Sequence, residues 1–250
     1  MEPTQTIRVP QSRYPDNNPK SALGVLKPGF HAIPPVAIHE MAKGYGGLIH
    51  LPPIALLHLG AAMHDGFRKY GLVNWRGNSV AASVYLNAGL RHAFAYRDGE
   101  DYAEDSKVHH LGHTLACCAI ILDARATGNL IDDRGTKGVF PQVCETGLCA
   151  EVIRCHLPQS THYTMLVDLM LAWWDGQDEV RLAGAGRYIR CHPLGLAMAH
   201  AGAILDGLEA GYITDDRPPP SNFSAVAARM SAELKARAAE AAKASEAVTT

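Results

Sequence analysis

Hydrophobic positions along this chain recur at helical spacing in segments that Gly, Pro or short polar turns separate. The segment PPIALLHLGAAMHDGFRKYG (52–71) repeats its large apolar residues every three or four positions and stops at Gly71. Just before it, HAIPPVAIHEMAKGYGG (31–47) begins with Pro34-Pro35 and ends in glycines, which predicts a short helix. The pattern therefore predicts two consecutive helices in the first third of the chain.

Two more helices are expected after these. One runs over about Ser79–Arg97 and is broken by Asp98-Gly99, and a polar loop then leads to Ser106 as the expected N-cap. The next, over about 107–126, is apolar on several sides, which is typical of a helix in the centre of a bundle. No stretch alternates over strand length, so the fold class predicted is mostly α.

An internal repeat appears when residues 111–134 are aligned with 194–217. LGHTLACCAIILDARATGNLIDDR and LGLAMAHAGAILDGLEAGYITDDR share their apolar frame and the Asp-Asp-Arg ending. Such self-similarity predicts a helical bundle with an internally duplicated helix-loop-helix unit. In the second copy Gln177, Pro193 and Leu196 stand where the first has Glu100, His110 and His113. We interpret it as a degenerate copy that covers the first.

Four regions follow from these patterns. Residues 1–30 are expected to form an irregular arm, 31–134 the first helical domain and 135–217 the degenerate second unit. Residues 218–250 begin with Pro-Pro-Pro and continue as an Ala-rich helical tail. The tail carries a narrow apolar seam, which leaves two interpretations open: a homo-oligomer contact or a solvated appendage.

Composition narrows the class of protein. With 250 residues, 47% of them hydrophobic, and a formal charge of −2, the chain is large enough for a real core. That charge gives no electrostatic footprint for a nucleic acid polymer. No apolar run approaches membrane-helix length, and the polar start is unlike a signal peptide, so we expect a cytoplasmic protein. The six cysteines are expected to be free thiols, with a Cys-His zinc site as the alternative.

The chemically richest stretch is GEDYAEDSKVHHLGH (99–113), which holds four carboxylates and three histidines in fifteen residues. On a helix His113 lies between His109 and His110, so it can share a ligand with either. The carboxylates of the preceding loop suit Mg²⁺ or Mn²⁺, and a histidine favours Mn²⁺ or a transition metal. The alternative is a group of histidines hydrogen-bonded to their neighbours, with no ligand.

Cationic and aromatic residues flank this stretch. Arg91, beside His92 on an otherwise apolar helix, is expected to need an anion, either a nearby carboxylate or a substrate phosphate. The segment FRKYGLVNWRG (67–77) offers Lys69 and Arg76 as cations, and Asn74 with Trp75 as groups for a base. Alternatively, these cations complement a helix dipole, and the tryptophan anchors a loop.

The order of several short motifs resembles one known family. They are PP-x-A-L at 52–56, KYG-x-x-NWR at 69–76, RH at 91–92, GE at 99–100 and H-L-x-H at 110–113. Over about residues 51–134 the chain is similar to the N-terminal domain of phage dATP/dGTP diphosphohydrolases, all-α relatives of MazG-like nucleotide pyrophosphohydrolases. The resemblance implies metal-dependent hydrolysis of a purine deoxynucleoside triphosphate (dATP or dGTP) to monophosphate and pyrophosphate, in phage nucleotide-pool control. It also implies that the protein acts in the host cytoplasm if a phage encodes it.

The resemblance also implies roles for individual residues. Glu100, His110 and His113 are the expected catalytic residues. The expected metal ligands for Mg²⁺ or Mn²⁺ are Glu100, Asp101, Asp105 and His113. The substrate-binding residues expected are Lys69, Asn74, Trp75, Arg76, Arg91 and His92. The chain departs from the MazG pattern because it lacks EExxE and has no carboxylate between Ser79 and Arg97.

Two other functions remain open at the level of sequence. A His/Asp metal phosphohydrolase with different nucleotide products fits the histidine-rich helix. A phage accessory protein that binds nucleotide or protein without catalysis fits the loss of polar residues in the second copy.

Overall fold

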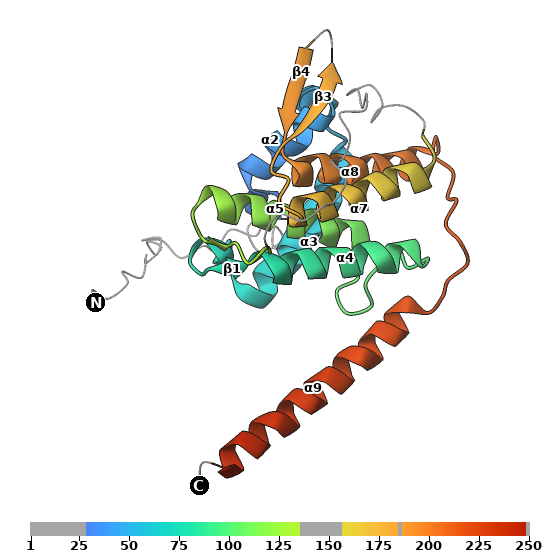
Figure 1. Ribbon diagram of the computed structural model, residues 1–250. Coiled ribbons are helices and arrows are strands. Elements are labelled where there is room, and N and C mark those ends of the chain that lie inside the picture. Colours follow the sequence, from blue (N-terminus) through green and yellow to red (C-terminus); the bar gives the residue numbers. More distant parts are fainter. Residues whose placement is uncertain (1–28, 136–156, 185–186, 249–250) are drawn as a thin grey trace, which may run out of the picture.

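The computed structural model describes residues 29–135, 157–184 and 187–248, and its elements are mostly helices (Figure 1). The predicted mostly-α bundle is therefore confirmed. The α-helices are α2 (Pro35–Gly44), α3 (Pro53–Tyr70), α4 (Ala82–Arg97), α5 (His110–Ala126), α7 (Gln159–Trp174), α8 (Pro193–Ala210) and α9 (Phe223–Val248). Short 3-10 turns η1 (Phe30–Ala32), η2 (Leu48–His50) and η3 (Asn74–Arg76) lie between them. Almost all of the expected N-terminal arm, together with Cys144, Cys149 and Cys155, lies outside the described residues.

Two helices begin later than the sequence predicted. Helix α4 starts at Ala82 because Val80–Ala81 form strand β1, which pairs in parallel with β2 (Leu130–Ile131). Helix α5 starts at His110, and its N-cap is His109, whose Nδ1 accepts a hydrogen bond from the Leu111 N–H at 3.1 Å. The prediction of Ser106 as N-cap is therefore wrong, since an imidazole fills that role.

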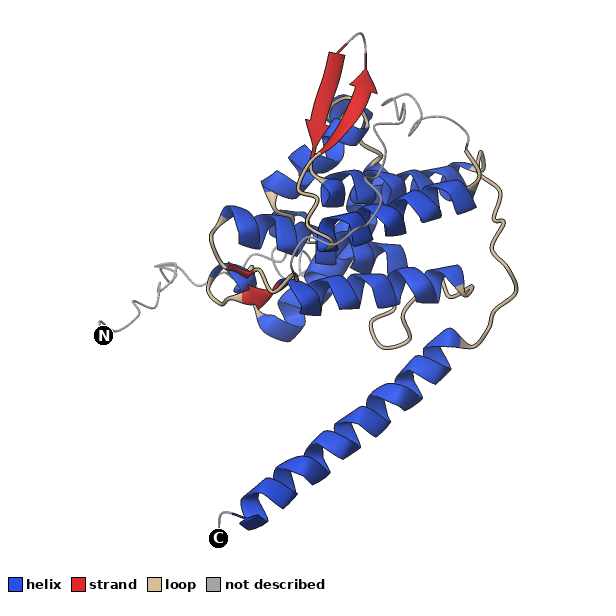
Figure 2. Cartoon of the chain, viewed as in Figure 1, coloured by secondary structure: helices blue, strands red, loops and turns tan. Residues whose placement is uncertain are grey.

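A β-hairpin is the longest strand element that the sequence did not predict. Strands β3 (Val180–Gly184) and β4 (Arg187–Cys191) pair antiparallel, with Val180 opposite Cys191 (Figure 2). Val180 and Leu182 are buried while Arg181 between them is exposed, so the expected alternation exists. It covers only these three residues before Ala183-Gly184, which is too short an alternation to predict a strand.

Helices α5 and α8 form the centre of the bundle. Helix α5 packs against α2, α3, α4 and α8, and most of its residues are buried, as its all-round apolar pattern predicted. Helix α8 is buried over nearly its whole length and packs against α7, α2, α5 and α3. The polar residues at the starts of these two helices are therefore held on a rigid core.

The described helices form two units that repeat each other. In the first unit α5 packs against α3 and α4, and in the second α8 packs against α2 and α7. Gly112 of α5 lies so close to His58 of α3 that an added Cβ would stand 2.8 Å from its carbonyl oxygen. Gly195 of α8 lies against Glu40 of α2 with the same closeness. Close helix approach at equivalent glycines thus defines both units.

The Asp-Asp-Arg endings tie the two units together reciprocally. Asp133 accepts a hydrogen bond from the Ser83 N–H at the start of α4, and Asp216 accepts one from the Ser160 N–H at the start of α7. The arginine that follows each pair crosses to the other unit. Arg134 donates to the Trp173 carbonyl and Arg217 to the Tyr96 carbonyl, at 2.7 and 2.9 Å, and each guanidinium also stacks on that aromatic ring.

The C-terminal helix α9 projects away from the bundle (Figure 1). Its start is fixed by Asp98, whose carboxylate accepts hydrogen bonds from the backbone N–H groups of Ser221 and Phe223. The seam of Val226, Met230 and Leu234 is exposed, so an oligomer contact there stays a prediction. No helix in the described ranges is long and apolar enough to cross a membrane.

Candidate active site

Three histidines meet between α4 and α5. The Nδ1 atoms of His92 and His110 lie 2.8 Å apart, so one of them donates a hydrogen bond to the other. The ring of His113, one helical turn after His110, stacks on that of His92 with centroids 4.4 Å apart. His92 and His113 are half-buried and His110 is buried. The expected catalytic pair His110 and His113 is thus joined by the expected substrate ligand His92.

Glu100 is the carboxylate nearest to this histidine cluster. Its Oε2 lies 3.6 Å from the buried Nε2 of His110, which has no hydrogen-bond partner among the described residues. A carboxylate at this position favours the His110 tautomer with its proton on Nε2. His110 Nδ1 then accepts from His92 Nδ1–H, and the Nε2 of His92 keeps a free lone pair. Catalytic hydrogen bonds in ligand-free sites are often this long.

Burial keeps these imidazoles neutral. It lowers the pKa of His92 to about 3, with neighbouring His113 and His110 as further causes. Burial also lowers the pKa of His113 and of His110, and Glu100 partly opposes the effect at His110. At neutral pH the histidine cluster therefore accepts and relays hydrogen bonds without carrying positive charge.

The outer side of the histidine cluster is polar. Ser106, which was expected to cap α5, instead contacts His113: its Oγ lies 2.8 Å from His113 Nε2. Lys69 at the end of α3 pairs with Asp65 at 2.8 Å and with Asp105 at 3.4 Å. Lys69 thus links α3 to the loop that carries the carboxylates.

A pocket of about 290 Å³ lies beside that loop. It is lined by His58, Asp101, Tyr102, His109, Leu205, Leu208, Glu209, Asp215 and Arg217. His58 and His109 face each other edge to face, with ring centroids 5.0 Å apart. Arg217 pairs with Asp101 and Asp215 at the border between the two units. Because His109 and His110 are consecutive, the pocket adjoins the histidine cluster.

The four expected metal ligands do not converge. Asp101 pairs with Arg217, Asp105 with Lys69, and Glu100 faces His110, while His113 contacts Ser106. Within the described ranges, no group of three or more His, Cys, Asp or Glu side chains is arranged to hold a metal ion. A metal site built from protein side chains alone therefore does not fit this arrangement.

The expected base-reading residues lie at the far end of α5. The Trp75 indole is buried and donates to Asp123 at 2.7 Å, and Arg76 donates to the same carboxylate at 2.6 and 3.0 Å. Asn74 belongs to the same short turn. Asp123 is thirteen residues after His110, or about 20 Å along the helix. The structure therefore does not bring these three residues to the histidine cluster.

Arg91 also differs from its prediction. It is exposed, so it needs no anion to offset burial, and the expected nearby carboxylate is not its partner among the described residues. No described carboxylate forms an ion pair with it, and it lies beside His92, whose pKa it helps to lower. Its charge is available at the edge of the histidine cluster.

The part of the chain that holds these features, from the end of α2 through α5 to the first Asp-Asp-Arg, also matches a known family. Residues 45–134 match the dATP/dGTP diphosphohydrolase N-terminal family. The family's name is that of a diphosphohydrolase, a hydrolase, and the match covers less than half of the chain. We call residues 45–134 the family segment. Searches of curated proteins and of solved structures find no match.

The pocket also contains residues that the sequence did not single out as part of a site. His58 and Tyr102 come from within the family segment, while Glu209, Asp215 and Arg217 come from the second unit. The shared Asp-Asp-Arg ending was the one signal that pointed to Arg217. Nothing in the sequence placed that arginine against Asp101, because the contact joins positions more than a hundred residues apart.

We expect Asp123→Asn to destabilise the fold without weakening nucleotide binding. Asp123 is buried and accepts three hydrogen bonds, so an amide would turn a donor toward Trp75 or Arg76. A loss of about 2–3 kcal/mol is expected, since Arg76 is partly exposed. Urea unfolding and titration with a purine deoxynucleotide would measure the two effects. Weaker binding at unchanged stability would place the base near Trp75 after all.

We also expect the free energy of unfolding to fall as the pH drops from 7 to 5. Burial lowers the pKa of His200 to about 3 and of His192 to about 4, whereas unfolded histidine titrates near 6.5. Between these pKa values the unfolded chain binds more protons than the folded one. The stabilising contribution of these histidines is therefore fully present above about pH 6.5 and decreases as the pH falls below it. Each histidine contributes up to about 1.4 kcal/mol per pH unit. Urea unfolding at several pH values tests this, and His200→Leu should reduce the slope.

Proposed function

We propose that this protein hydrolyses purine deoxynucleoside triphosphates, dGTP and dATP, to the monophosphate and pyrophosphate. The observation that carries the proposal is that the family segment contains the whole histidine cluster and the loop with Glu100. The match to a diphosphohydrolase family thus includes His92 and His109, the two histidines of the first unit whose pKa burial lowers to about 3.

In this reaction a water oxygen bonds to the α-phosphorus, and the bond from that phosphorus to the oxygen bridging the α and β phosphates breaks. Pyrophosphate leaves, and the water gives up a proton. The Nε2 lone pair of His92 is the acceptor proposed to orient this water, with His110 and Glu100 fixing its tautomer. Because its pKa is low, His92 is assigned to positioning the water, and the proton passes on to solvent.

Positive charge for the phosphates is proposed to come from Arg91 and Lys69. Arg91 is exposed beside His92 and makes no ion pair within the described residues. Lys69 is held by Asp65 and reaches the loop through the exposed Asp105, which a phosphate can displace. Both cations flank the face where His92 and His113 stack.

Dependence on Mg²⁺ or Mn²⁺ remains part of the proposal. Since the carboxylates do not form a ligand set of their own, such an ion would arrive with the triphosphate, and Glu100 is the protein carboxylate proposed to contact it. Mg²⁺ is commonly held by one or two carboxylates together with substrate phosphates. When bound, it would neutralise phosphate charge and acidify water.

Product analysis tests the proposal. The full chain would be incubated with each of the four deoxynucleoside triphosphates and Mg²⁺ or Mn²⁺, and the products separated by anion-exchange chromatography. We expect monophosphate and pyrophosphate in equal amounts from dGTP and dATP, with little turnover of dCTP or dTTP. Orthophosphate, or nucleoside with intact triphosphate, would instead support the other class of metal phosphohydrolase.

A second candidate is a protein that binds the nucleotide without hydrolysing it. Ion pairing favours it, because Asp101 and Asp105 already have cationic partners and metal ligands do not converge. Nucleotide binding in calorimetry, with no product under Mg²⁺, Mn²⁺, Co²⁺ or Zn²⁺, would support this candidate over the enzyme.

A further inference from the structure

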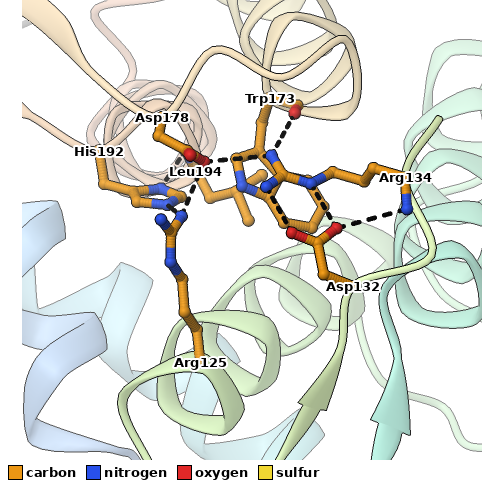
Figure 3. Close-up of polar contacts among 7 residues, drawn as sticks. All are labelled: Arg125, Asp132, Arg134, Trp173, Asp178, His192 and Leu194. Carbon is orange, nitrogen blue, oxygen red and sulfur yellow. Dashed lines mark hydrogen bonds and ion pairs between the residues drawn. The ribbon is translucent and has the colours of Figure 1, made fainter. Parts of the chain in front are cut away.

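A cluster of polar side chains at the start of α8 is the counterpart of the pocket at the start of α5. Figure 3 shows Asp178 between the guanidinium groups of Arg125 and Arg134, which donate to its Oδ1 at 2.7 and 3.1 Å. His192, the N-cap of α8, lies beside Arg125, its Nε2 3.2 Å from an Arg125 nitrogen. A single carboxylate thus accepts from two guanidinium groups at this place.

The first unit has the same group with one member missing. Asp101 corresponds to Asp178, His109 to His192 and Arg217 to Arg134, by the repeat and by equivalent contacts. Leu208 stands at the position of Arg125. Asp101 therefore accepts from one guanidinium only, and both it and Leu208 line the pocket of about 290 Å³.

His109 provides an unused donor at this pocket. It is 7% exposed, and its Nδ1 already accepts from the Leu111 N–H. Burial lowers the pKa of His109 to about 3, so the ring is neutral and its proton is on Nε2. No described residue accepts a hydrogen bond from that Nε2–H. His109 lines the pocket, so this donor is available to a ligand or water there.

We propose that this pocket binds the guanine base of a deoxyguanosine nucleotide by its Watson–Crick edge. The N1–H and 2-amino donors of guanine present a carboxylate with the donor pair that a guanidinium offers, so they would take on Asp101 the place that Arg125 takes on Asp178. The neighbouring O6 would accept from His109 Nε2–H. Tyr102 and His58 supply rings for stacking. This assignment deepens the proposed function by naming its preferred base.

Adenine fits the same groups less well. Its edge carries one amino donor beside the N1 lone pair, which would face a carboxylate with no proton between them. Hypoxanthine keeps N1–H and O6 but lacks the 2-amino group, so it isolates one of the proposed hydrogen bonds. The acidic lining of Asp101, Glu209 and Asp215 disfavours base edges with more acceptors than donors, such as that of thymine, whose single N3–H lies between two carbonyl oxygens.

Calorimetry with monophosphates tests the pocket independently of any hydrolysis. The full chain would be titrated with dGMP, dIMP, dAMP and L-arginine. We expect dGMP to bind about 10- to 100-fold more tightly than dIMP, with dAMP weaker still. Equal affinity for dGMP and dIMP would overturn the assignment of the 2-amino group. Tighter binding of L-arginine than of dGMP would overturn the proposal, because the ligand of the pocket would then be a guanidinium group and not a base.

A matched pair of variants places the site. Leu208→Arg copies the second unit into the first and should weaken dGMP at least about 10-fold by supplying the missing guanidinium. Arg125→Leu makes the reverse change and should leave dGMP binding as in the wild type. If Leu208→Arg fails to fold, Asp101→Asn should reduce dGMP to the affinity of dIMP. Wild-type affinity for dGMP in Leu208→Arg or in Asp101→Asn would overturn the proposal. If the dGMP affinities follow the expected pattern but no deoxynucleoside triphosphate is hydrolysed, only the proposed function is contradicted.

Discussion

Replacing Glu100 by Gln should lower kcat for dGTP hydrolysis by about 100-fold or more. The Glu100 carboxylate lies 3.6 Å from the buried His110 Nε2 and favours the tautomer that leaves the His92 Nε2 lone pair free. An amide can donate as well as accept, so the tautomer preference of the pair is lost. General acid–base groups and the residues that orient them typically contribute factors of this size.

A control variant in the same loop separates chemistry from folding. Glu104 is exposed and forms no ion pair within the described residues, so Glu104→Gln should keep wild-type kcat and the same thermal midpoint. Glu100 is itself partly exposed, so the midpoint of Glu100→Gln should also change little. Equal activity of both variants would remove Glu100 from the proposed site. A KM effect with unchanged kcat would limit it to binding.

Arg217→Ala should destabilise the protein by about 2–3 kcal/mol. The side chain is 10% exposed, pairs with Asp101 and Asp215, donates to the Tyr96 carbonyl and stacks on that ring. Its removal leaves two carboxylates without their cation. The expected loss is below that of a fully buried pair because both carboxylates are half-exposed.

The matched variant is Arg134→Ala, which removes the equivalent contacts from the second unit. Its side chain is 9% exposed, pairs with Asp132 and Asp178 and stacks on Trp173, so a similar destabilisation is expected. Only Arg217 lines the pocket, so only Arg217→Ala should also weaken dGMP binding. Urea unfolding and calorimetry on both chains measure these effects. A loss of dGMP affinity in both variants would show that fold loosening alone explains it.

The helices were predictable because local signals define them. Apolar residues at a 3.6 period, Pro pairs at helix starts and glycines at helix ends located α2, α3 and α4 to within a few residues. The start of α5 was misplaced because His109 caps it, and capping by a histidine ring has no sequence signature comparable to serine. The hairpin β3–β4 was missed because Ala183-Gly184 in β3 and Tyr188-Ile189 in β4 interrupt the alternation of apolar and polar residues.

The candidate site was predictable only where its residues are local. Glu100 and His110 meet because a short loop joins them, and the sequence pattern already grouped them. Trp75 and Arg76 were placed with them on motif order alone, yet the buried Asp123 holds them at the opposite end of α5. The pocket depends on Arg217, which reaches it through the packing of two distant repeats. Such long-range contacts follow from tertiary packing and have no local pattern.

Hydrogen–deuterium exchange of the full chain tests most directly whether nucleotide binds at the start of α5. The ligand would be a dGTP analogue with an imido group between the α and β phosphates, added with Mg²⁺. We predict slower amide exchange in residues 98–113 and 205–217, and unchanged exchange in 73–78. Protection of 73–78 with none in 98–113 would contradict the account, because the nucleotide would then lie at the Asp123 end of α5.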